Sequence, residues 1–156
     1  QWILFFFLNF FFSLLSVYNG TGASEGIRKG CERIQHLFED WFNENELAFD
    51  LTPFNGRSDY GPFIEAGIPA GGLFTGAEEI KTMEGRAKYG GMANTAYDPC
   101  YHQDCDTIEN VNVDVLLQMA KAAASTLETL ALEKDLRGWL KSWSEKSELC
   151  WSLHPK

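Results

Sequence analysis

The sequence lacks the common phosphate-binding motifs and is poor in basic side chains. Neither GxGxxG nor a P-loop occurs among its 14 glycines, so a nucleotide cofactor has no support. Lys and Arg number 13 against 22 Asp and Glu, which gives a net charge of -9 over 156 residues. Nucleic-acid-binding domains depend on basic surfaces. We therefore expect no nucleic-acid partner, and a chain of this length predicts a single main domain.

Metal-binding motifs are equally scarce. No CxxC and no HExxH occurs, and the four cysteines have no second Cys/His cluster that could complete a zinc finger or ribbon. Cys100 and Cys105 are close in sequence, a spacing that favours a disulfide in an exported protein. The sequon Asn19-Gly20-Thr21 fits the same compartment.

Charged side chains are absent from residues 1–24, where six of the twelve phenylalanines fall within the first twelve positions. Three interpretations compete: a signal-peptide core, a membrane anchor, or sequence foreign to the mature protein. A signal peptide begins with Met and a basic region, whereas this chain begins with Gln1 and its first basic residue is Arg28. We expect an apolar leader over 1–24, either a targeting segment or an artefact of the gene model, placed before a truncated domain.

The central part of the chain predicts an α/β fold with a mostly parallel sheet and flanking helices. Apolar side chains recur at helical spacing from Glu25 to about Asn45. A short alternating strand follows over 47–51, then a helix closed by Gly67, then a buried strand that ends in glycine. Strand, helix and strand at this spacing predict a βαβ crossover, with ligands bound beyond the carboxyl ends of the strands.

The remaining segments predict a loop and two helices. Residues 84–110 lack periodicity and are expected to form a long loop. Asn112 is expected to cap a helix, and residues 25–131 would then form the domain and 132–156 a helical tail that packs on the domain or on a partner. The predicted inner face of the helix comprises Leu116, Met119 or Ala120, Ala123, Leu127 and Leu130, and the tail carries Leu136, Trp139, Leu140 and Trp143 at helical spacing.

His102 is the sharpest chemical candidate, because imidazole is a common metal ligand and a short disulfide loop would restrict its direction. The alternative is a solvated loop histidine. Glu78-Glu79 resembles a base-plus-ligand pair, although such pairs are usually solvated. Arg57 either meets a substrate charge or pairs with Asp59, and Ser58 has no nearby base that would make it a nucleophile. The residues alone indicate an exported α/β domain with a candidate metal-binding loop, and they specify no reaction.

Two long blocks carry a resemblance to a known family. "NGRSDYGPFIEAGIPAGGLFTGAEEIKT" and, further on, "YGGMANTAYDPCYHQDCDTIENVN" resemble the C-terminal part of the secreted di-zinc aminopeptidases, metallopeptidase family twenty-eight. The likeness runs from roughly Glu32 to Ala131. It implies an α/β/α fold around a mostly parallel sheet and the removal of N-terminal residues from peptide substrates. It also implies two zinc ions held by two His and three carboxylates and bridged by a water, with a Glu as general base.

The resemblance assigns roles to individual residues. His102 is similar to the family's second zinc-binding His, and Tyr101 to the tyrosine whose hydroxyl stabilises the oxyanion. Cys100 and Cys105 match the disulfide around that loop. The substrate pocket would be lined by Arg57 and Phe74.

The other metal ligands of the family precede the first block, where this sequence has the Phe-rich run instead. Glu78-Glu79 cannot replace the missing pair, because the resemblance places it after the later strand. We therefore expect a fragment of a secreted or extracellular zinc aminopeptidase that is inactive as this chain alone. The alternative is a non-catalytic, membrane-tethered binding module of the same fold, anchored by the leader.

Overall fold

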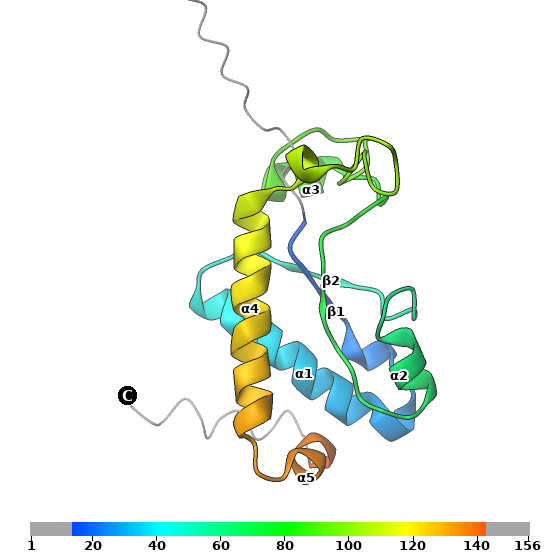
Figure 1. Ribbon diagram of the computed structural model, residues 1–156, viewed down its shortest axis with the longest axis vertical. Helices are drawn as coiled ribbons and strands as arrows, with labels where there is room; N and C mark the ends of the chain where they lie inside the picture. Colours follow the sequence, from blue (N-terminus) through cyan, green and yellow to red (C-terminus); the bar gives the residue numbers. More distant parts are fainter. Residues whose placement is uncertain (1–13, 143–156) are drawn as a thin grey trace, which may run out of the picture.

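A computed structural model describes residues 14–142, which form a small three-stranded sheet with helices packed against it (Figure 1). The strand order is β2-β1-β3, with β1 at Ser16–Tyr18, β2 at Asp50–Thr52 and β3 at Leu73–Phe74. The α-helices are α1 (Glu25–Glu44), α2 (Gly61–Glu65), α3 (Met83–Tyr89), α4 (Val113–Leu132) and α5 (Leu136–Lys141), and the 3-10 turns are η1 (Gly20–Gly22) and η2 (Ile108–Asn110).

The middle strand comes from residues that the sequence analysis assigned to a leader. Ser16 and Val17 of β1 are completely buried, and Leu14 and Leu15 before them belong to the hydrophobic core. The expected boundary at residue 24 therefore has to move back to Leu14 or earlier. Residues 1–13 lie outside the described part of the chain. Within the described residues, no helix has the length and apolar character needed to cross a membrane.

The sheet is mixed, and the expected crossover is wrong. β1 pairs in parallel with β2, and α1 is the helix that connects these two strands. β3 lies on the other side of β1 and runs antiparallel to it, so β2 and β3 do not pair through α2 as predicted. The error follows from the misplaced leader boundary, because without β1 the two remaining strands appear to be neighbours. A mostly parallel sheet is not confirmed.

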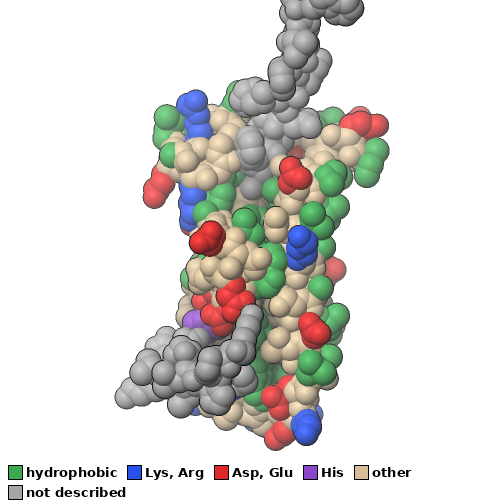
Figure 2. All heavy atoms as spheres, turned by 90° about the vertical axis from the view of Figure 1, so that its left-hand side faces the viewer, with side chains coloured by type: hydrophobic (Ala, Val, Ile, Leu, Met, Phe, Trp, Pro, Cys, Tyr) green, Lys and Arg blue, Asp and Glu red, His purple; other side chains and the backbone are tan. Residues whose placement is uncertain are grey.

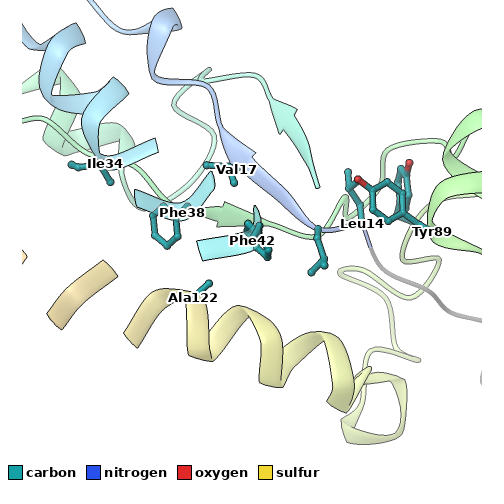
Figure 3. Packing of buried hydrophobic residues seen from close by; sticks show 9 residues of the cluster. Leu14, Val17, Ile34, Phe38, Phe42, Tyr89 and Ala122 are labelled. Carbon is teal, nitrogen blue, oxygen red and sulfur yellow. The ribbon is translucent and has the colours of Figure 1, made fainter. Parts of the chain in front are cut away.

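The long helix α1 buries the face that its periodicity predicts. Ile27, Cys31, Ile34, Phe38 and Phe42 are all buried. Figure 3 shows Phe38 and Phe42 between Val17 of β1 and Ala122 of α4, so one apolar stripe contacts both the sheet and the second long helix. Complete burial of a side chain of this size stabilises the fold by about 1.5–3 kcal/mol.

Helix α4 begins where predicted, and its inner face agrees with the predicted one only in part. The side chain of Asn112 accepts a hydrogen bond from the Val115 amide at 3.2 Å, as expected of an N-cap. The buried residues of α4 are Ala122 and Thr126, whereas Leu127, which was expected on the inner face, is 67% exposed. Met119 packs against the core as expected, and Leu130 lines a shallow hollow beside Ile34 of α1. Figure 2 shows hydrophobic and charged side chains interspersed on one face of the molecule.

Two segments differ from the expected loop and tail. Helix α3 forms inside the predicted loop, where the Thr82 side chain accepts a hydrogen bond from the Gly85 amide at 3.0 Å. Helix α5 packs on α1: the Arg33 guanidinium lies 3.4 Å from the centroid of the Trp139 ring and donates to the Trp139 carbonyl at 2.8 Å. This part of the tail therefore packs on the domain, while Trp143 lies outside the described residues.

A close approach between η1 and α1 places β1 relative to the helix. A Cβ at Gly20 would lie 2.5 Å from the carbonyl carbon of Cys31 and from the Glu32 nitrogen. The Gly20 amide donates to the buried side chain of Gln35 at 2.6 Å, and Gln35 in turn donates to Glu39 at 2.6 Å. Because the clashing atoms belong to helix backbone, only glycine fits at position 20.

Gly20→Ala should therefore destabilise the protein by about 3 kcal/mol, since the added methyl would force β1 away from α1. Gly26→Ala is the matched control: a Cβ there meets no described atom within 4 Å, and an exposed helical alanine should stabilise by about 0.5–1 kcal/mol. Chemical denaturation of both variants measures the difference. Equal stabilities would show that the close approach does not constrain the fold.

Candidate functional site

A cavity of about 360 Å³ opens where the ends of the strands meet the loops that follow them. Its wall draws on segments far apart in the sequence, from β1 to α4. The residues that line it include Tyr18, Arg57, Phe74, Asp98, Tyr101 and Met119. The predicted ligand-binding segments after β2 and β3 do meet here. The prediction relied on the rule that ligands bind at the carboxyl ends of parallel strands. That rule does not explain the meeting of these segments, because β3 runs antiparallel to β1.

Aromatic rings form the apolar part of this wall. The Tyr18 ring lies between Tyr60, at a centroid distance of 4.6 Å, and Phe74, at 6.0 Å. Phe54 stacks on Tyr60 at 4.4 Å and extends the group away from the cavity. Burial raises the pKa of the Tyr18 hydroxyl above its ordinary value. The arrangement suits an apolar side chain that enters beside a few polar groups.

The rim carries an ion pair between Arg57 and Glu78, with 2.5 Å between Nη2 and Oε1. The hydrogen bond from Arg57 holds the pKa of the Glu78 carboxyl below its ordinary value, and the same bond raises the pKa of Arg57. Both side chains are well exposed, so the pair contributes little to stability. Arg57 pairs with Glu78 and not with Asp59. The neighbouring Glu79 differs from Glu78, because burial raises the pKa of its carboxyl.

The loop that follows is closed by a disulfide between Cys100 and Cys105, whose Cα atoms lie 5.2 Å apart. Inside it, the Gln103 amide donates to the Cys100 carbonyl at 2.8 Å and closes a β-turn with Tyr101 and His102 at its centre. His102 has a φ of +57°, in the left-handed region that costs most residues about 1–2 kcal/mol. Strain of this kind clusters at functional sites.

The turn places its two side chains differently. Tyr101 is half-buried and lines the cavity, whereas His102 is exposed and does not line it. The two rings stack, with centroids 3.9 Å apart and an interplanar angle of 21°. The imidazole is therefore held beside the cavity by the neighbouring ring.

The structure thus brings Arg57, Phe74 and Tyr101 to one cavity and puts His102 next to it. Residues 14–142 contain no group of three or more His, Cys, Asp or Glu side chains that could hold a metal ion. His102 is therefore not joined by two further side chains of these kinds within the described residues. Sequence reasoning missed Tyr18, because it fell in the supposed leader. The sequence of this uncharged run gives no local signal that singles out Tyr18.

Comparison with known proteins identifies similar sequences. The model of a family described as peptidase family M28 matches residues 10–127. The chain is 43% identical over 123 residues to the probable leucine aminopeptidase 2 of Aspergillus fumigatus, covering 78% of this chain and 25% of that protein. It is 43% identical over 118 residues to an aminopeptidase of Pseudomonas aeruginosa, covering 74% of this chain and 22% of that one. A leucine aminopeptidase 2 of Trichophyton rubrum is 40% identical over 124 residues, 80% of this chain and 24% of that one. The chain spans about a quarter of the length of these curated relatives.

The left-handed backbone of His102 can be tested by stability alone. Asparagine tolerates this conformation better than alanine, so His102→Asn should be more stable than His102→Ala by about 1 kcal/mol. At His36, inside α1, helix propensity should reverse the order by about 0.5 kcal/mol. Urea denaturation of the four variants gives both differences. The same order at both positions would mean that the turn does not impose the left-handed conformation.

Proposed function

This chain belongs to peptidase family M28, and from that premise we propose that it forms part of the substrate site of a zinc-dependent aminopeptidase that releases N-terminal residues from peptides. The observation that carries the proposal is the convergence of Arg57, Phe74 and Tyr101 on one cavity. The names of the relatives support the same activity. Because the chain spans about a quarter of their length, the activity belongs to a larger protein of which this chain would be a part.

The residues of the cavity have distinct roles in this proposal. Phe74 and Tyr18 offer an aromatic surface to the side chain of the N-terminal residue. Arg57, partly neutralised by Glu78, lies at the rim, where the rest of the peptide would leave the cavity. The Tyr101 hydroxyl would donate a hydrogen bond to the oxygen of the scissile carbonyl as negative charge develops on it.

Zinc enters the proposal through His102. Zinc sites use three or four protein ligands, and residues 14–142 offer no group of three. His102 would therefore supply one imidazole nitrogen to a site completed by side chains from outside these residues. The 156-residue chain by itself should bind zinc weakly and hydrolyse no aminoacyl substrate.

The disulfide also bears on location. Disulfides persist in oxidising compartments, so the Cys100–Cys105 bond supports a secreted or extracellular protein. The competing proposal is a non-catalytic binding module of the same fold. Its distinguishing property would be a folded and metal-loaded site without turnover.

A hybrid enzyme tests the proposal directly. The quarter of the Pseudomonas aeruginosa aminopeptidase that aligns with this chain is replaced by the matching residues of the chain, and hydrolysis of aminoacyl p-nitroanilides is followed. The hybrid should be active, and Tyr101→Phe should lower kcat by about 10²–10³ with zinc content unchanged. His102→Ala should lose both zinc and activity.

Tyr97→Phe provides the matched control for the lost hydroxyl. Tyr97 is buried near the same loop, but it does not line the cavity, and its hydroxyl forms no hydrogen bond with the described residues. The control should keep the kcat of the unmodified hybrid. A folded, zinc-loaded hybrid without turnover would instead favour the binding module, and equal losses at Tyr97 and Tyr101 would remove the oxyanion role.

A further inference from the structure

Besides the disulfide, hydrogen bonds to the Asp98 carboxylate hold the loop that carries Tyr101 and His102. One carboxylate oxygen of Asp98, Oδ1, accepts hydrogen bonds from the Cys100 amide at 2.9 Å and from the side-chain amide of Asn110 at 3.0 Å. The same Asn110 nitrogen lies 3.4 Å from Oδ1 of Asp106. Asp98 and Asn110 stand at the two ends of the segment, so their contact closes its neck.

Asp98 is itself anchored to the body of the domain. Its amide donates to the Ala77 carbonyl at 2.9 Å, and the preceding residue, Tyr97, is buried with its ring against Gly76. Asn110 ends η2, two residues before Asn112, the N-cap of α4. The Asp98–Asn110 contact therefore joins two rigid parts of the domain across an exposed loop. Hydrogen bonds to a carboxylate are about twice as strong as those between neutral groups.

The same contact bears on the turn at the tip. The Asp98 carbonyl accepts from the Tyr101 amide at 3.3 Å, while its carboxylate holds the amide of Cys100, the residue that begins the β-turn. A left-handed His102 persists only where its surroundings impose that backbone. The disulfide alone links the two ends of a six-residue ring and leaves the orientation of that ring relative to the cavity open.

We propose that Asp98 and Asn110 are positioning residues, which orient the Tyr101–His102 turn over the cavity by closing the neck of the loop. The inference rests on the function proposed above. Asn110 does not line the cavity, so its contribution would pass entirely through the turn. Asp98 does line the cavity, so substituting it would also remove any direct contact with substrate. Comparing variants of the two residues therefore distinguishes positioning of the turn from contact with substrate.

The first measurement uses the 156-residue chain and needs no activity. Hydrogen exchange at the Gln103 amide, which closes the turn, is compared in the unmodified chain, Asn110→Ala, Asp98→Ala and the double variant. Asn110→Ala should speed exchange about 10-fold, the effect of losing one hydrogen bond to a charged acceptor, and Asp98→Ala, which also removes the acceptor of the Cys100 amide, should speed it at least as much. The double variant should show little further change, because both substitutions break the same contact. Asp104→Ala is the control: it removes a charge from the same loop, and its carboxylate has no partner among the described residues.

The second measurement uses the hybrid enzyme. Asn110→Ala should lower kcat about 10-fold with KM nearly unchanged, and Asp104→Ala should alter neither. Exchange at Gln103 that is insensitive to Asn110→Ala would overturn the proposal, and so would faster exchange with an unchanged kcat. A hybrid that is inactive without any substitution would count against the proposed function. The exchange data would then still decide whether Asp98 and Asn110 set the turn.

Discussion

The burial of β1 between two other strands is the constraint on which the arrangement of the molecule depends. Its backbone pairs on both sides. Its last residue, Tyr18, donates its amide to the Gly72 carbonyl at 3.1 Å, and the next residue, Asn19, donates to the Thr52 carbonyl at 2.9 Å. Because buried amides and carbonyls need partners, the segments after β2 and before β3 are held in register by the same short strand. The cavity is lined by Tyr18 at the end of β1, by the segment after β2 and by β3 with the residues that follow it.

The site combines this rigid frame with an exposed loop that the frame alone does not order. The aromatic group around Tyr18 belongs to the packed part of the domain, whereas His102 lies on a turn with few contacts to the core. Such a turn keeps a strained backbone only through local ties, here a disulfide, a carboxylate and a backbone hydrogen bond. An exposed loop held beside a packed scaffold is a general way to place polar groups next to a cavity.

The predictable parts of this structure are those whose signal is local. The spacing of Ile27 to Phe42 predicts α1 because one helix face meets one core, and the closeness of Cys100 and Cys105 predicts their bond.

The position of β1 was not predictable in this way, since an apolar run that begins at the first residues shows no boundary at Leu14. The buried face of α4 was predicted only in part. A helix rich in Ala and Leu has more than one apolar side, and close packing on α1 selects the side with the smaller residues. Within the site, the two motif blocks identified Arg57, Phe74 and Tyr101 as candidates. That these residues lie at one cavity depends on the strand order, which no local sequence pattern indicates.

The outer side of α4 has a consequence for the behaviour of the chain in solution. Leu116 and Leu117 are 56% and 50% exposed, on a molecule whose net charge is -9. Apolar side chains in contact with water favour association between copies, and like charge opposes it through a repulsion that salt screens over about 10 Å at 0.1 M ionic strength. Colloidal stability of the chain therefore depends on a balance between these two forces. Its solubility should be greatest in dilute buffer and decline as the ionic strength rises.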